Sequence, residues 1–312
     1  MKNVIKVALL INDTPVPEVV ARHGDYLEIF TRHLRDSVES YPDESVRGLE
    51  LVVDGYEVRE GKFPEVEGYD AVMMTGSASS AYEPLPWITR LISFIRDLIT
   101  DPSKSHTKVI GICFGMQILA LATGSIVAPN PAGWELGIYD VDLTPCGRDW
   151  LARVLGGADR EGKEVPLLAE GEVVEKVDAG EVVKREQEVL HRDHVTSLPA
   201  NTELLGSTPK CPVQGFIQYY PSSSPSLPRK IHILALQGHP ELIPDIVNRI
   251  IDVRSAKGVL DEPTTREARE RVGREMVGGM GVVGKGGNKV DGLNGLIGRG
   301  VVGWAVVQVL LE

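Results

Sequence analysis

The first 122 residues alternate between short apolar segments and segments whose apolar residues recur at helical spacing. We expect strands at the apolar, β-branched segments 2–11, 49–54, 70–75 and 108–112. Helical spacing recurs over 26–34, 85–99 and 115–122. Because strands joined through helices pair in parallel, the alternation predicts an α/β fold with a mostly parallel open sheet and helices on both faces.

The pattern changes beyond residue 125. Short apolar segments follow one another closely, and we expect strands, some of them antiparallel, at 137–143, 202–207, 216–220 and 231–237. Helical patterns return at about 241–256 and 264–276. We therefore expect one domain over 1–256, in which the charged stretch 147–188 is a surface insertion. Residues 257–312 are expected to be a helical extension with a glycine-rich linker and a short amphipathic C-terminal helix.

Charge and cysteine content exclude several classes of protein. A formal net charge of -11 lacks the basic surplus that nucleic-acid phosphates require. No apolar run approaches the roughly 18 residues that span a bilayer, and the N-terminal apolar segment is better explained as a strand than as a signal peptide. The three cysteines Cys113, Cys146 and Cys211 are too few for a disulfide scaffold. We expect a cytoplasmic protein with no membrane or nucleic-acid partner.

Cys113 lies where an apolar strand runs into a helix, in the segment VIGICFGMQ at 109–117. A sharp Gly-x-Cys-x-Gly turn lifts a nucleophile above the edge of a sheet. The N-terminus of the following helix favours the reactive thiolate, and the backbone N–H of Phe114 is placed to bind an oxyanion. On this pattern alone, a buried core cysteine is an equal alternative, because free cysteines are often buried.

His239 is the best candidate for the base that a cysteine nucleophile needs. It follows the apolar strand 231–237, and strand ends in open α/β sheets are where sites form. Glu241 lies two residues later, so in extended chain both side chains point to the same side, and the carboxylate can orient the imidazole. A loop with a capping glutamate would explain His-Pro-Glu alone, but the cysteine turn makes a catalytic pair the better interpretation.

The two motifs together resemble the class I (triad) glutamine amidotransferase family. Its members carry Gly-x-Cys-x-Gly-x-Gln and later Gly-His-Pro-Glu, which stand here at 111–117 and 238–241. The resemblance covers about residues 1–255 and implies a flavodoxin-like architecture. The segments 75–77, 86–88, 133–135 and 191–194 also resemble the stand-alone GMP-synthase-like subgroup.

The resemblance implies roles for individual residues. Cys113 would be the nucleophile, His239 the general base and acid, and Glu241 the orienting carboxylate. Backbone N–H groups of Gly76, Ser77 and Phe114 would form the oxyanion hole, and the substrate's γ-glutamyl end would lie near Gln117, His191, Arg192 and Asp193. Many members have Gly-Gly-Pro at the oxyanion turn, whereas this chain has Gly-Ser-Ala at 76–78, which suggests a differently shaped glutamine pocket.

The implied function is hydrolysis of the γ-carboxamide of glutamine through a cysteine thioester, which releases glutamate and ammonia. No metal or other cofactor is expected, because the histidines and cysteines show no zinc-ligand spacing. The chain has no P-loop and no synthase domain, so either a separate synthase subunit accepts the ammonia or the enzyme only hydrolyses.

Three alternatives stay open at this point. The nearest is a γ-glutamyl peptidase that acts on glutathione-type conjugates. A catalytically silent regulatory or binding protein could keep the same residues. A dienelactone-hydrolase-like α/β-hydrolase also places cysteine on a sharp turn, but that fold orders its acid before its histidine, and here Glu241 follows His239.

Overall fold

The computed structural model of the chain describes residues 3–41, 43–104, 106–155, 184–221, 229–278, 282–283 and 299–312. The strands of these residues are β1 (Val4–Ile11), β2 (Glu50–Glu57), β3 (Ala71–Met74), β4 (Lys108–Ile112), β5 (Val127–Pro129), β6 (Glu135–Leu143), β7 (Lys184–His191), β8 (Asp193–Val195), β9 (Glu203–Ser207), β10 (Gly215–Tyr219), β11 (Ile231–Leu236) and β12 (Val282–Val283). The helices are α1 (Pro17–His23), α2 (Tyr26–Glu39), α3 (Glu44–Arg47), α4 (Pro86–Thr100), α5 (Phe114–Ala122), α6 (Pro145–Leu155), α7 (Pro244–Ala256), α8 (Glu262–Gly278) and α9 (Arg299–Leu311), with a 3-10 turn η1 (Val58–Glu60).

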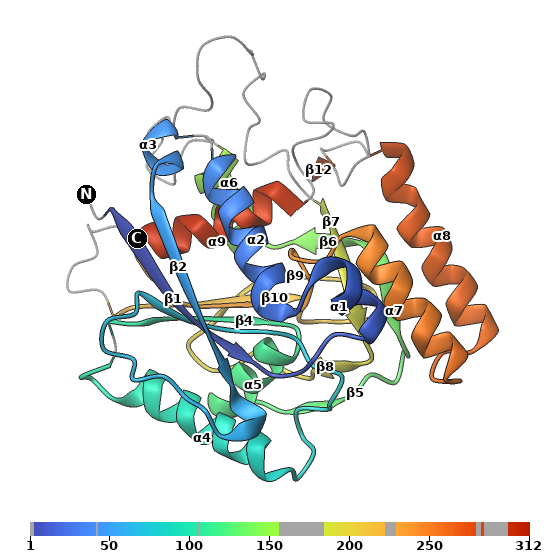
Figure 1. Ribbon diagram of the computed structural model, residues 1–312, viewed down its shortest axis with the longest axis horizontal. Coiled ribbons are helices and arrows are strands. Elements are labelled where there is room, and N and C mark those ends of the chain that lie inside the picture. The colour runs from blue at the N-terminus through green and yellow to red at the C-terminus, as the bar shows by residue number, and fades with distance from the viewer. Residues whose placement is uncertain are drawn as a thin grey trace.

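The main sheet has a parallel half and an antiparallel half. Its strand order is β12-β7-β6-β9-β10-β11-β4-β3-β1-β2 (Figure 1). The strands from β11 to β2 are parallel, and those from β10 to β12 pair antiparallel. The predicted α/β fold with an open, helix-flanked sheet is confirmed, and the sheet is mixed. Because β3, β4 and β11 are parallel neighbours, their carboxyl ends meet at one edge.

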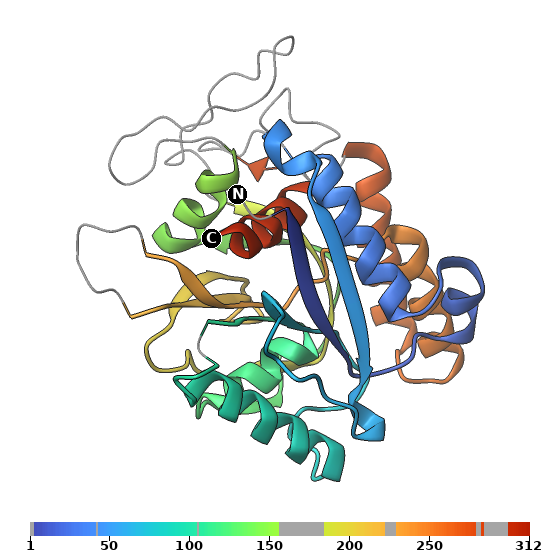
Figure 2. The same ribbon diagram turned by 60° about the vertical axis from the view of Figure 1, so that its left-hand side comes forward.

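Helices cover both faces of the sheet because the side chains of β1 alternate between two apolar layers. Val7 and Leu9 pack with apolar residues of α2, α6 and α9, whereas Ala8 and Leu10 pack with those of α4 and α5. Figure 2 shows α4 and α5 on the opposite side of the sheet from α2 and α9. A third apolar layer joins α1, α7 and α8 to β6.

The C-terminal helix differs from the amphipathic helix expected from the sequence. In α9, residues 302, 304–307, 309 and 310 are buried, which leaves almost no polar face. The reason is its position: α9 contacts α2, α6 and β11 and so belongs to the main core. The glycine-rich linker lies almost wholly outside the described residues.

The predicted insertion 147–188 takes part in the fold at both of its ends. It begins within α6, where Trp150 and Leu151 are buried in the main core. It ends within β7, which pairs antiparallel with β6. Residues 156–183 lie outside the described part. No helix of the described part is both long and apolar enough to span a membrane.

The turn from β4 into α5 depends on two glycines that permit close approach of backbone. A Cβ atom on Gly111 would lie 2.5 Å from the carbonyl oxygen of Gly115, and one on Gly115 would lie 2.9 Å from that of Met74. Both distances are shorter than a van der Waals contact. The atoms in the way belong to the backbone, so they cannot move aside as a flexible side chain could.

We therefore expect Gly111→Ala to lower the free energy of unfolding by about 3 kcal/mol, because α5 must shift away from β4. Denaturant unfolding measures the change. Gly48→Ala is the matched control, because no atom lies within 4 Å of its added Cβ, and it should change stability by less than about 0.5 kcal/mol. Equal effects of the two substitutions would contradict this packing account.

Candidate active site

Cys113 occupies the strained position of a strand-to-helix turn. Its backbone has a φ of 52° and a ψ of -105° at the N-terminal cap of α5, a conformation that non-glycine residues rarely adopt. Its N–H donates to the carbonyl of Leu236, 2.7 Å away, which ties the turn to the end of β11. The side chain is buried, yet it lines a cleft at the carboxyl edge of the sheet.

His239 and Glu241 form a buried pair just beyond β11. The Nδ1 atom of His239 lies 2.7 Å from Oε1 of Glu241, which leaves Nε2 as the free nitrogen of the ring. A Cβ on Gly76 would lie 3.0 Å from Cε1 of His239 and 3.7 Å from Cβ of Cys113. The ends of β3, β4 and β11 therefore bring the three residues predicted as a triad into one cluster.

The charges in this cluster keep His239 protonated. Burial alone would lower the pKa of His239, but the Glu241 carboxylate and the Cys113 side chain outweigh it and raise that pKa to about 10. A protonated imidazole beside a cysteine stabilises the thiolate, which is the nucleophilic form. The pair of His239 and Glu241 therefore puts a cation beside the sulfur of Cys113.

The raised pKa of His239 predicts a pH dependence of stability. A histidine whose pKa is higher in the folded than in the unfolded state stabilises the fold, because folding favours its protonated form. This stabilisation has its full size at pH values below 6.5, the pKa of the unfolded state. This contribution is lost as the pH rises through about 10. We expect the difference in unfolding free energy between wild type and His239→Gln to be largest near pH 6.5 and to shrink toward pH 10, as measured by denaturant titration.

Arg269→Gln is the control for this titration. It removes one partner of the exposed pair with Asp252, and such an exposed ion pair contributes little to stability at any pH from 6.5 to 10. Its effect on unfolding should not change across that range. A His239→Gln effect that stays constant, or grows, as the pH rises would contradict the raised pKa.

The turn after β3, which carries the predicted oxyanion donors, is held by Asp13. This carboxylate accepts a hydrogen bond of 2.7 Å from the N–H of Ala78 and one of 3.2 Å from the hydroxyl of Ser77. Arg59 pairs with its other oxygen at 2.8 Å. Sequence reasoning missed Asp13, because nothing in its local sequence signals a contact with residues 77 and 78.

The predicted substrate-binding residues are joined through one carbonyl oxygen. That of Asp193 accepts hydrogen bonds from Nε2 of Gln117 at 3.2 Å and from Nδ1 of His191 at 2.9 Å. The hydroxyl of Tyr82 donates to the Asp193 carboxylate at 3.2 Å. Arg192 is exposed and lines the cleft. Gln117, Arg192 and Asp193 thus share the cleft of Cys113.

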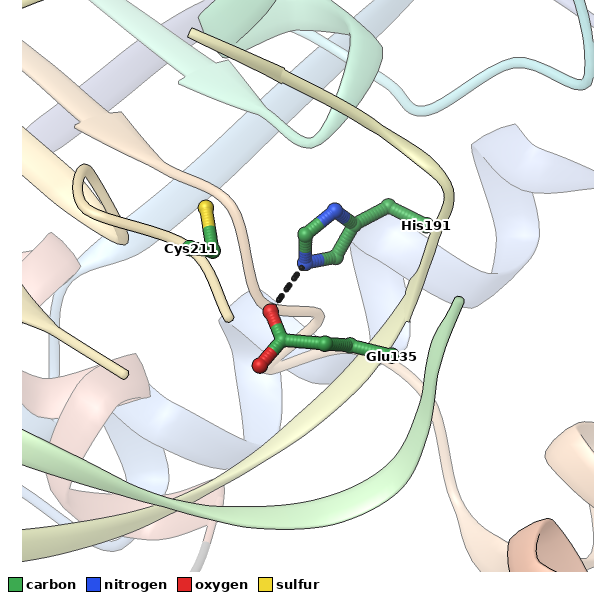
Figure 3. A group of neighbouring side chains, drawn as sticks. All are labelled: Glu135, His191 and Cys211. Atoms are coloured by element: carbon green, nitrogen blue, oxygen red, sulfur yellow. Dashed lines mark ion pairs between the residues drawn. The ribbon is translucent and has the colours of Figure 1, made fainter. Parts of the chain in front are cut away.

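A second cluster of cysteine, histidine and glutamate is buried beside the cleft (Figure 3). Nε2 of His191 lies 3.0 Å from Oε2 of Glu135. Each of the three residues, Glu135, His191 and Cys211, has one potential metal-ligand atom, and these three atoms lie within 4.8 Å of one another. The Glu135 carboxylate also accepts hydrogen bonds from Thr208 and Gln214, at 2.6 Å and 2.7 Å. Burial alone would raise the pKa of Glu135, but these partners, His191 first, lower it.

Cys211 is poorly suited to nucleophilic attack. It is completely buried, and its thiol donates to the carbonyl of Val213 at 3.4 Å. Burial, reinforced by the charge of Glu135, raises the pKa of Cys211 to about 12. The three side chains are also of types that bind divalent cations, but the hydrogen bonds of Glu135 already occupy both of its oxygens. The contact between Glu135 and His191 links the start of β6 to the 191–193 segment.

The cleft itself has a volume of about 190 Å³ and opens to solvent. Its walls are formed by the turn at 77–80 with Tyr82, by Cys113 and Gln117 of the strand-to-helix turn, and by the segment 190–193. Two residues from more distant elements, Trp134 and Arg254, complete the lining. Sequence reasoning missed Arg254, because one arginine in an ordinary helical pattern carries no motif.

Comparison with known proteins identifies the family of this chain. A model of the family "Glutamine amidotransferase class-I" matches residues 44–249. A glutamine amidotransferase-like protein of Schizosaccharomyces pombe is 32% identical over 270 residues, which cover 85% of this chain and 90% of that protein. Gamma-glutamyl peptidase 4 of Arabidopsis thaliana is 29% identical over 248 residues, covering 78% of this chain and 79% of the relative.

The fold has a similar counterpart among solved structures. The crystal structure of a glutamine amidotransferase from Thermotoga maritima superposes with a TM-score of 0.58 and covers 99% of both chains at 17% identity. The family model and the relatives lead to one conclusion: this chain belongs to the class-I glutamine amidotransferase family.

Proposed function

We propose that the protein is a cysteine hydrolase that cleaves γ-glutamyl amides, with Cys113 as nucleophile, His239 as general base and acid, and Glu241 as the carboxylate that orients His239. The observation that carries the proposal is the buried contact of 2.7 Å between His239 and Glu241 beside a cysteine in a strained turn. A nucleophile, a base and an orienting group in that order are the requirements of a catalytic triad.

The first step is attack of the Cys113 thiolate on the γ-carboxamide carbon. A carbon–sulfur bond forms, and the carbonyl π electrons move onto oxygen. The N–H of Phe114, in the first turn of α5, has no intrahelical acceptor and is free to stabilise the oxyanion. The N–H groups of Gly76 and Ser77 are the other proposed donors. Loss of one such donor costs roughly 3 kcal/mol of transition-state stabilisation in comparable sites.

The second step is collapse of the tetrahedral intermediate. Protonated His239 gives its proton from Nε2 to the leaving nitrogen as the carbon–nitrogen bond breaks. A γ-glutamyl thioester on Cys113 remains, and His239 is then neutral. It takes a proton from water, which attacks the thioester carbon, and glutamate and the thiolate are released with the imidazole again protonated. The Glu241 carboxylate stabilises each imidazolium state.

The second cluster is assigned a supporting role in this account. Its cysteine, Cys211, has a thiol with a raised pKa and lies behind the cleft wall. By contrast, Cys113 lines the cleft and lies at the amino end of a helix. The Glu135–His191 pair is proposed to hold Asp193 and Gln117 against the γ-glutamyl end of the substrate.

Two substrate classes fit the proposed chemistry. Glutamine is the substrate that the family name implies, and its ammonia would go to water or to a separate synthase subunit. Assignment to the GMP-synthase-like subgroup rests on the sequence motifs. γ-Glutamyl peptides are the second class, and they are favoured by the relatives named gamma-glutamyl peptidases, of which one is 29% identical to this chain.

Release of glutamate from glutamine and, separately, from glutathione tests the proposal. Cleavage of either by the purified protein supports it, and the rates decide between glutaminase and γ-glutamyl peptidase. Absence of glutamate release from both substrates would contradict it.

A further inference from the structure

The turn that follows β3 lies against the proposed triad. It reads Gly-Ser-Ala-Ser-Ser from Gly76 onward, and all but the first of these residues line the cleft of Cys113. A Cβ on Gly76 would lie 3.7 Å from that of Cys113. Among the described residues, the N–H groups of Gly76 and Ser77 have no acceptor, whereas the next two N–H groups each donate to a side-chain oxygen. Two unused backbone donors therefore stand in this turn, next to the proposed nucleophile.

The sequence of the turn does little to fix its shape. Residues 76–80 belong to no helix or strand, and they include no proline that would fix a backbone angle. Small residues leave the backbone many conformations, and an ordered conformation costs about 1–2 kcal/mol per residue in entropy. Backbone donors stabilise an oxyanion only when they lie about 2.7–3.1 Å from its oxygen. Contacts from outside the turn must therefore hold it in place.

Asp13, which follows the end of β1, makes such contacts. Its Oδ2 atom accepts hydrogen bonds from the N–H of Ala78 at 2.7 Å and from the hydroxyl of Ser77 at 3.2 Å. Its Oδ1 atom pairs with Arg59 at 2.8 Å. Hydrogen bonds to a carboxylate are roughly twice as strong as those between neutral groups. The carboxylate therefore anchors the turn from its outer side, and Arg59 fixes the carboxylate.

Asn12 anchors the other side of the two unused donors. Its N–H donates to the hydroxyl of Thr75 at 3.0 Å, and its side-chain amide donates to the carbonyl oxygen of Thr75 at 2.7 Å. Both residues are completely buried. The N–H groups of Gly76 and Ser77 thus lie between two positions that the end of β1 holds.

We propose that Asp13 is a positioning residue of the active site, whose carboxylate holds the N–H groups of Gly76 and Ser77 where they can meet the oxyanion that forms when Cys113 attacks. This inference rests on the proposed function and deepens it. Asp13 is not among the residues that line the cleft. Because the oxyanion exists only after the attack, loss of Asp13 should slow turnover without weakening substrate binding.

Asp13→Ala is expected to lower kcat about 10–100-fold and to change KM less than about threefold. The measurement is steady-state glutamate release from glutamine and from glutathione. Asp70→Ala is the matched control: the Asp70 carboxylate also accepts a backbone N–H, that of Lys6 at 2.8 Å, but it precedes the amino end of β3. It should keep kcat within about threefold of wild type. Denaturant unfolding of both variants should show similar losses of stability.

Alkylation by iodoacetamide separates an effect on the oxyanion from an effect on the thiolate. In this reaction the Cys113 thiolate displaces iodide from a saturated carbon, so no carbonyl oxygen gains charge. The rate of alkylation at Cys113, followed by mass spectrometry, should differ less than about threefold between wild type and Asp13→Ala.

Ala78→Pro tests the contact itself in a double-mutant cycle. Proline has no N–H to give to Asp13, and its ring would occupy the place of that hydrogen, against the carboxylate. Ala78→Pro should therefore lower kcat at least about fivefold more in wild type than in Asp13→Ala, where the carboxylate is absent.

Three outcomes would overturn the assignment of Asp13. They are a kcat in Asp13→Ala within about threefold of wild type, an alkylation rate that falls as much as kcat does, and an equal effect of Ala78→Pro in the two backgrounds. Each of them can occur while wild type hydrolyses its substrate and Cys113→Ala does not, which leaves the proposed function intact. Hydrolysis that is absent in wild type, or that persists in Cys113→Ala, contradicts the proposed function instead.

Discussion

Cys113→Ala is expected to lower the rate of γ-glutamyl amide hydrolysis by at least about 10⁴-fold, because no other group can form the thioester. The positive φ of 52° is equally unusual for cysteine and alanine, so the substitution adds no new backbone strain. The free energy of unfolding should change by no more than about 1 kcal/mol. Glutamate release, measured beside denaturant unfolding, checks both expectations.

Cys211→Ala is the matched control, because the described residues place Cys211, like Cys113, in a cluster with a histidine and a glutamate. The variant should keep the rate within about threefold of wild type, since the proposed chemistry does not use that thiol. If Cys211→Ala abolished hydrolysis and Cys113→Ala preserved it, the roles assigned to the two clusters would have to be exchanged.

Glu241→Gln is expected to lower kcat by about 10²–10⁴-fold with little change in KM. The amide cannot stabilise the imidazolium that forms when His239 takes a proton, and its NH₂ group can favour the wrong tautomer. Because the residue lies behind His239 and has no place in the cleft lining, substrate affinity should be nearly unchanged. Steady-state kinetics over a range of substrate concentrations separates the two constants.

Glu135→Gln provides the contrasting variant for this prediction. It leaves His191 buried without its carboxylate partner at 3.0 Å, so the free energy of unfolding should fall by about 3 kcal/mol. The fall in kcat should stay below about tenfold, because Glu135 acts only through the 191–193 segment. A larger loss of kcat in Glu135→Gln than in Glu241→Gln would contradict the assignment of the triad.

The residues proposed as the triad could be predicted because each lies in a local pattern. A strand followed at once by Gly-x-Cys-x-Gly fixes the environment of Cys113 within nine residues of sequence, and β4 and α5 lie close to where that pattern predicts them. His239 and Glu241 follow the apolar strand β11 in the same way. Parallel pairing of β4 with β11 then brings the two patterns together.

Other parts of the site could not be predicted, because they depend on contacts between distant segments. Asp13 holds the turn at 77 and 78 across more than sixty residues of sequence. β7 has a charged sequence, KREQEVLH, and is a strand because its backbone pairs with β6. Arg254 lies in a helix whose sequence shows only ordinary spacing. Such residues become visible only when the fold places them beside the cleft.

The most direct test of the central claim is covalent labelling with an electrophilic γ-glutamyl analogue such as a glutamine chloroketone, followed by mass spectrometry of the digested protein. The account predicts one adduct, on the peptide that contains Cys113, which excess glutamine or glutathione suppresses and which is much slower to form in His239→Gln. An adduct on Cys211, or no adduct on Cys113 in protein that still releases glutamate, would contradict it.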